Sequence, residues 1–91
     1  MEELTPGGLH RLAEEGKNAV ILFHTPFCGT CRLAERMLDI VAAMCSGLPF
    51  YKVNINFVPD RAREWRLESV PCVLLLSGGQ PVHKQYRMGS V

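Results

Sequence analysis

Apolar positions along the first half of the chain change their period twice, and each change marks an expected element. After Thr5 and Pro6, a pair typical of helix starts, leucine and alanine recur at helical spacing and predict a helix over residues 6–15. The continuous apolar run 19–23 is short and indicates a strand covered on both faces. Residues 30–45 return to the helical rhythm and predict an amphipathic helix, with Arg32, Glu35, Arg36 and Asp39 on its polar side.

The second half of the chain predicts three more strands and a short helix. Residues 50–55 alternate as a strand does, and a helix is expected over residues 59–67. Residues 73–76 predict a third strand, and the turn 77–80 leads into a polar edge strand over residues 82–87. The order strand, helix, strand in the middle of the chain predicts a right-handed βαβ unit.

These elements predict one α/β domain over residues 1–91, with a central mixed sheet of about four strands flanked by helices. Hydrophobic residues make up 47% of the 91-residue chain, which suits one small domain with a modest core. We therefore expect neither a second domain nor an internal repeat.

The charge balance gives no preference for a polyanionic partner. Ten Lys and Arg against nine Asp and Glu leave a net charge of +1, so we expect no nucleic-acid and no membrane partner. No apolar run approaches the length of about 20 residues that a membrane span needs, and the segment 1–4 is acidic where a secretory signal would be basic. We expect a cytoplasmic protein, in which paired thiols are usually catalytic or metal-bound.

Two cysteines stand three residues apart, between the first strand and the second helix. Cys28 and Cys31 would share one face of the first helical turn, close enough for their sulfurs to meet. At the helix entry, unpaired N–H groups and the helix dipole favour a negative sulfur on Cys28, and the thiolate is the form that attacks a disulfide. Cys31, one turn in, should be more buried and suited to resolve a mixed disulfide. Gly29 and Thr30 leave the site narrow and uncharged.

Core packing and zinc are the alternative interpretations of this pair. A closed zinc site needs four ligands, and beyond the pair the chain offers only scattered Cys45, Cys72 and His24. Cys45 lies 14 residues after Cys31 on the same predicted helix, a separation of about 21 Å. We expect no metal site and no bound cofactor.

From about residue 19 to residue 89, which is most of its length, the sequence resembles the thioredoxin family. The resemblance rests on several landmarks in order: the apolar strand ending in residues 23–27, the Cys-Gly-Thr-Cys site, residues 52–56, Val70-Pro71, Gly78-Gly79 and Gly89. It implies a thioredoxin-like fold in which Cys28 attacks and Cys31 resolves, while Pro71 is cis and faces the redox pair. The residues implied to bind substrate are Phe27, Gly29, Thr30, Val70 and Pro71.

The chain departs from the family beneath the resolving cysteine. Thioredoxins usually carry a buried aspartate there, and this chain has Leu22, which leaves Lys52 without the family's acidic neighbour. Without a buried base Cys31 should lose its proton less readily, because apolar surroundings raise a thiol's pKa. We expect slower resolution or turnover than a standard thioredoxin shows, and faster resolution after Leu22→Asp.

Further positions each have two interpretations. His24 replaces the family's usual tryptophan and is either a substitute base or an exposed neighbour of the site. Cys72 follows Pro71 and is either a small core residue or a regulatory thiol that bridges to Cys28. Thr30 replaces the family's proline, which affects the redox potential. Packing roles are expected for Cys45, Met37 and Met44.

Family members continue beyond the position of Gly89 into a final helix that covers part of the sheet. We expect this chain to lack that helix, since two residues follow Gly89, and to expose an apolar patch. Such patches are commonly buried in oligomers, so a homodimer is the corresponding hypothesis.

The leading functional hypothesis is a dithiol–disulfide oxidoreductase in cell redox homeostasis, with protein disulfides as substrates and a reductase that recharges the pair. A non-catalytic thioredoxin-fold module for redox sensing or interaction is the alternative, because Leu22 and the short C-terminus weaken the case for turnover. A glutathione-dependent protein of the glutaredoxin kind is a third interpretation, although the usual Cys-Pro-aromatic-Cys site is absent.

Overall fold

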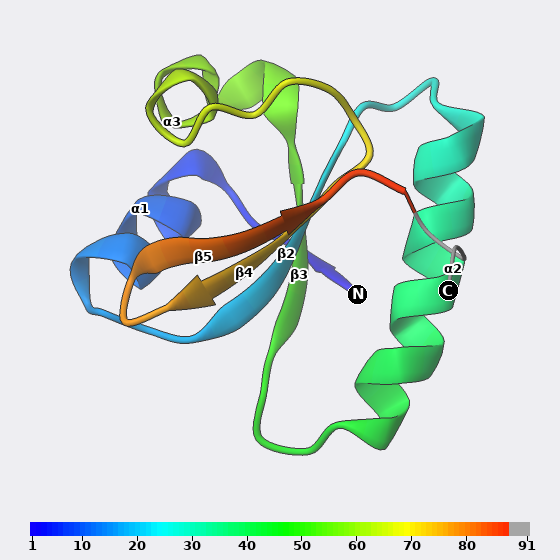
Figure 1. Ribbon diagram of the computed structural model, residues 1–91, viewed down its shortest axis with the longest axis horizontal. Coiled ribbons are helices and arrows are strands. Elements are labelled where there is room, and N and C mark those ends of the chain that lie inside the picture. Colours follow the sequence, from blue (N-terminus) through cyan, green and yellow to red (C-terminus); the bar gives the residue numbers. More distant parts are fainter. Residues whose placement is uncertain (88–91) are drawn as a thin grey trace.

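A five-stranded mixed sheet lies between two helices on one side and a single long helix on the other (Figure 1). The computed structural model describes residues 1–87. The strand order is β1-β3-β2-β4-β5, with bounds β1 (Glu2–Glu3), β2 (Ala19–His24), β3 (Phe50–Asn54), β4 (Cys72–Ser77) and β5 (Gln80–Gln85). The helices are α1 (Pro6–Glu14), α2 (Gly29–Met44), the 3-10 turn η1 (Ile55–Phe57) and α3 (Pro59–Glu64). The expected α/β class is confirmed.

The pairing of the strands brings distant segments to one end of the sheet. β1, β3 and β2 run parallel, whereas β4 is antiparallel to both β2 and β5. Leu22 is in register with Lys52, and Phe23 is in register with Cys72. The end of β2, which leads into the two-cysteine segment, therefore lies beside the start of β4.

Several expected boundaries were wrong. The strand β1 was not predicted, because two acidic residues show no strand alternation; pairing with β3 holds it in the sheet. The helix expected over 59–67 ends at Glu64, and Arg66 with φ +56° turns the chain out of it. The last strand ends at Gln85, before its expected end. Among residues 1–87 no helix follows β5, and the landmark Gly89 lies outside the described residues.

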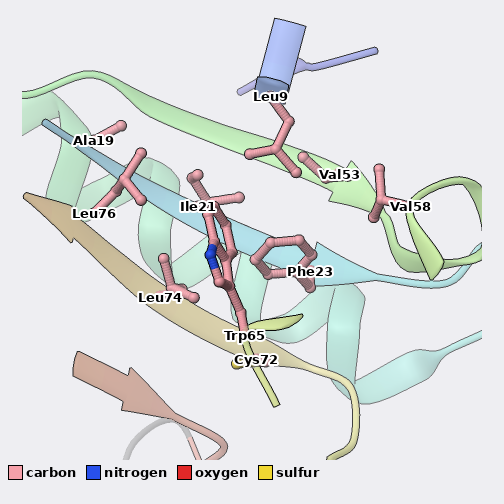
Figure 2. Packing of buried hydrophobic residues seen from close by; sticks show 10 residues of the cluster. All are labelled: Leu9, Ala19, Ile21, Phe23, Val53, Val58, Trp65, Cys72, Leu74 and Leu76. Atoms are coloured by element: carbon pink, nitrogen blue, oxygen red, sulfur yellow. The ribbon is translucent and has the colours of Figure 1, made fainter. Parts of the chain in front are cut away.

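The main core lies between the sheet and the pair α1 and α3 (Figure 2). Leu9 of α1 is buried in this core, and the Trp65 ring meets the Phe23 ring edge-on with 6.4 Å between the ring centroids. Beneath α2, a smaller cluster joins Leu22 with Ala34 and Leu38. The two layers thus place alternate residues of β2 on opposite faces of the sheet.

The predicted hairpin turn between β4 and β5 is confirmed and depends on two glycines. Gly78 and Gly79 have φ of +59° and +79°, the left-handed region that favours glycine. The Gly79 N–H donates to the carbonyl of Lys17 at 3.0 Å, and a Cβ on Gly79 would collide with the Ala13 carbonyl oxygen. The turn therefore packs closely on the end of α1.

The helix α2 exposes a row of apolar side chains. Only Cys31, Ala34 and Leu38 are buried against the sheet, since one helix meets a sheet along one face. The expected packing role was wrong for Met44 and Cys45, which are exposed at the end of the helix. The large exposed apolar residues of α2 are Leu33, Ile40, Val41 and Met44. No helix among residues 1–87 is long and apolar enough to cross a membrane.

Candidate active site

Cys28 and Cys31 lie at the start of α2 and are joined by a disulfide. Their Cα atoms are 5.1 Å apart, as expected for two residues on one helical turn. Cys28 is the N-cap residue, and its Sγ accepts a hydrogen bond from the Cys31 N–H at 3.2 Å. Cys31 is only 3% exposed, whereas Cys28 is partly exposed. Of the two cysteines, Cys28 is thus the more accessible to solvent.

The environment of the Cys28 sulfur favours its ionised form. A helix N-terminus presents unpaired N–H groups and the positive end of the helix dipole. The Thr30 hydroxyl oxygen lies 3.4 Å from the Cys28 Sγ and can donate to it. These groups stabilise negative charge on sulfur, which is the condition for nucleophilic attack.

A pocket of about 240 Å³ opens beside the inner cysteine. The Lys52 ammonium donates to a Glu35 carboxylate oxygen at 2.9 Å, with side chains 23% and 27% exposed. Lys52 lacks the family's aspartate, as the sequence indicated, and Glu35 approaches it from α2 instead. Sequence reasoning placed Glu35 on the polar side of the helix; its i+4 spacing from Cys31 was the available signal. The pocket is lined by His24, Thr25, Pro26, Cys31, Arg32, Glu35 and Lys52.

His24 ends β2 and lies on the same pocket. Its Nε2 is 3.0 Å from a carboxylate oxygen of Glu3, which belongs to the unexpected strand β1. Since a carboxylate only accepts, the imidazole donates Nε2–H in this bond. Glu3 thereby fixes the orientation of the His24 ring, whose side chain is 15% exposed.

The remaining residues implied to bind substrate surround the entry to α2. The Val70-Pro71 peptide bond is cis, as the resemblance implied, and both residues are half-buried. They directly precede β4, whose first residue pairs with Phe23, so they lie at the same end of the sheet as the cysteines. Phe27 is 98% exposed, and Gly29 and Thr30 are also exposed.

The other two cysteines are free thiols outside the Cys28–Cys31 disulfide. Cys72 has no exposed surface and packs in the core on the α1 and α3 side of the sheet. Burial raises the pKa of its thiol, opposed in part by a hydrogen bond with Tyr86 and by the charge of Lys84. Cys45 is an exposed free thiol at the end of α2. No three His, Cys, Asp or Glu side chains gather as metal ligands within residues 1–87.

Comparison with known sequences identifies the family. The thioredoxin family model matches residues 9–89, and the chain belongs to that family. It is 44% identical over 72 residues to the thioredoxin-like protein YusE of Bacillus subtilis, covering 79% of this chain and 68% of that protein. It is 30% identical over 77 residues to thioredoxin H2-2 of rice, Oryza sativa, covering 85% of this chain and 57% of that relative.

Solved structures show the same fold. Mitochondrial thioredoxin 3 of Saccharomyces cerevisiae, in its oxidised form, superposes with a TM-score of 0.79 at 24% identity, covering 93% of this chain and 81% of the yeast chain. Fasciola hepatica thioredoxin gives a TM-score of 0.78 at 22% identity, covering 94% and 86%. A thioredoxin-family domain with a Cys-x-x-Cys pair supports a general role in thiol–disulfide exchange.

Proposed function

We propose that this chain is a dithiol–disulfide oxidoreductase that reduces disulfides in other proteins. The Cys28 thiolate attacks one sulfur of the substrate disulfide, forms a mixed disulfide and expels the first substrate thiolate. The Cys31 thiolate then attacks the Cys28 sulfur and expels the second substrate thiolate. Two electrons pass to the substrate, the departing thiolates take up protons, and the Cys28–Cys31 disulfide remains.

The observation that supports this proposal is the difference between the two sulfurs. Cys28 caps α2 and is partly exposed, while Cys31 is buried. A nucleophile needs access to its substrate, and a resolving thiol needs only access to its partner sulfur. The surrounding residues Phe27, Gly29, Thr30, Val70 and Pro71 are proposed to bind an extended substrate segment next to Cys28.

Insulin reduction with dithiothreitol as electron donor tests this function. We expect turnover well above the dithiothreitol background by the parent protein and by Cys45→Ser, and none above that background by Cys28→Ser. Turnover equal to dithiothreitol alone would instead support the non-catalytic module, which the exposed Phe27 and the apolar Leu22 favour. Glutathione as sole donor is expected to give no activity, because the site lacks the Pro-aromatic pair of glutaredoxins.

The cellular setting is proposed on the same chemistry. A reductase must return two electrons to the Cys28–Cys31 disulfide after each cycle. A cytoplasmic location and a part in cell redox homeostasis fit the exposed free thiol of Cys45, since such thiols persist in reducing compartments.

A homodimer through α2 is also proposed. The exposed positions Leu33, Ile40 and Met44 follow helical spacing and form one stripe, together with Val41. Packing of this stripe against the same stripe of a second copy would bury both, as two-fold symmetric interfaces do.

A further inference from the structure

Resolution of the mixed disulfide requires the Cys31 thiol to lose a proton in a buried position. Cys31 is 3% exposed, and Leu22 beneath α2 has no exposed surface and no group that accepts a proton. Resolution is therefore fast only if another side chain of the site accepts the proton of the Cys31 thiol. Glu35 is the acidic residue on the same pocket as Cys31.

We propose that Glu35, held in place by Lys52, accepts the proton of the Cys31 thiol during resolution. The inference rests on the proposed function, since it concerns the second step of that reaction. Glu35 follows Cys31 by four residues on α2, so the two side chains lie on the same side of the helix. The proposed proton acceptor thus lies on α2, whereas the aspartate usual in the family would lie on the strand at position 22.

The position of Lys52 supports this role. Lys52 is in register with Leu22 on β2, and its ammonium bonds Glu35 at 2.9 Å. The ammonium offsets the charge of the carboxylate, so that a Cys31 thiolate can form nearby at lower electrostatic cost. Both side chains keep about a quarter of their surface exposed, at 23% and 27%, which lets the proton leave to water.

Two further side chains with ionisable groups line the pocket, and we compare each with Glu35 as a proton acceptor. His24 faces it from β2 and Arg32 from α2. The Nε2–H of His24 is donated to Glu3 of β1, so only its Nδ1 could take up a proton, and His24→Gln tests this alternative. Arg32 is a permanent cation and accepts none.

Resolution transfers one proton and exchanges one disulfide bond for another. The Cys31 S–H proton moves to the Glu35 carboxylate, and the Cys31 thiolate attacks the Cys28 sulfur of the mixed disulfide. The bond from Cys28 to the substrate sulfur breaks as the bond from Cys31 to Cys28 forms. Glu35 then releases its proton to the departing substrate thiolate or to water, and is ready for another cycle.

Stopped-flow reaction of the reduced protein with one equivalent of Ellman's reagent separates the two steps. Attack by Cys28 releases one coloured thiolate, and resolution by Cys31 releases the second. All proteins carry Cys45→Ser, which removes the exposed competing thiol. Glu35→Gln keeps the shape and the hydrogen bond to Lys52, and Glu64→Gln, another ion-paired helical glutamate, is the matched control.

We expect Glu35→Gln to leave the first phase unchanged and to slow the second about a hundredfold near neutral pH, as loss of a general base does. The difference in second-phase rate between Glu35→Gln and the parent should shrink as pH rises, because hydroxide then removes the proton of the Cys31 thiol. Lys52→Met should slow the second phase by less, and Glu64→Gln and His24→Gln should not slow it.

Two results would overturn the inference alone. One is a second phase in Glu35→Gln as fast as in the parent or faster; the other is a slow second phase in His24→Gln with Glu35→Gln unaffected. A parent protein that releases only one thiolate, or releases the second equally in Cys31→Ser, would instead overturn the proposed function, and the inference with it.

Discussion

Cys45 and Cys72 differ in the surroundings of their sulfur atoms, and this difference predicts their reactivity. Burial raises the pKa of the Cys72 thiol, so its reactive thiolate forms only at higher pH than in an exposed cysteine. We expect iodoacetamide to modify Cys45 readily in the folded protein, and Cys72 only slowly, with the gap narrowing as pH rises. Intact mass after timed alkylation, with Cys45→Ser as control, measures this.

The same burial supports a packing role for Cys72 over a regulatory one. Mass spectrometry of mildly oxidised protein would show a Cys28–Cys72 bridge if the third thiol took part in redox chemistry. Cys72 lies in the core on the α1 and α3 side, whereas the redox pair belongs to α2. We expect no such bridge, and alkylation of Cys72 as fast as that of Cys45 would contradict this account.

A carboxylate at position 22 is expected to speed resolution at the expense of stability. Leu22 lies next to Lys52 in the sheet and packs under Ala34 and Leu38. Leu22→Asp in the Glu35→Gln background should restore much of the second phase, while loss of the buried leucine costs about 2–5 kcal/mol of unfolding free energy. Leu22→Asn is the matched uncharged control, and equal rates for Asp and Asn would contradict the prediction.

At the residue scale, the sequence predicted the redox pair but not the residues that surround it. The spacing of Cys28 and Cys31 places them on one helical turn whatever the rest of the chain does. The partner of Lys52 depends on how α2 is rotated over the sheet, and periodicity alone assigned Glu35 to the solvent side. A contact between a strand and a helix, such as that of Lys52 with Glu35, can be predicted only once the tertiary structure is known.

At the scale of elements, the β4–β5 turn requires glycine at one position more than at its neighbour. Gly79→Ala would place a Cβ against the Ala13 carbonyl oxygen as well as in the left-handed region, whereas Gly78→Ala meets open space. We expect Gly78→Ala to cost about 1–2 kcal/mol for its backbone conformation alone and Gly79→Ala to cost clearly more. Urea denaturation measures both, and equal losses would contradict the close packing of the turn on α1.

Elements with strong periodicity were predicted, and those that depend on pairing were not. The long helix α2 and the buried strand β2 follow from runs of apolar residues whose period is clear. The strand β1 has two residues and exists through its pairing with β3, which no local pattern reveals. Likewise, the apolar positions near the end of α2 indicated a helix face but not whether the sheet reaches far enough to cover it.

At the scale of the whole molecule, the exposed stripe of α2 predicts self-association. Ile40 and Met44, which are 64% and 74% exposed, belong to α2, on the side of the sheet opposite α1 and α3 (Figure 1). We expect light scattering to show a concentration-dependent dimer, and Ile40→Glu to shift it toward monomer. Val82→Glu on β5 is a matched control at an exposed position and should leave the monomer–dimer equilibrium unchanged. A monomer mass across all concentrations would reject the dimer.

The arrangement of the whole chain gathers the site at one end of the sheet. β2 ends at His24 and leads to the cysteines, while β4 begins directly after the cis Val70-Pro71 bond. Antiparallel pairing of these two strands places both segments together. The partly exposed Cys28 and the buried Cys31 are the basis of the proposed division between attack and resolution.

Trapping of a mixed disulfide tests that division most directly. Each variant, made in a Cys45→Ser background, is reduced, mixed with an oxidised protein substrate and analysed by intact mass. The account predicts that Cys31→Ser accumulates a covalent complex through Cys28, and that Cys28→Ser accumulates none. Complexes that form equally in both variants, or only in Cys28→Ser, would contradict it.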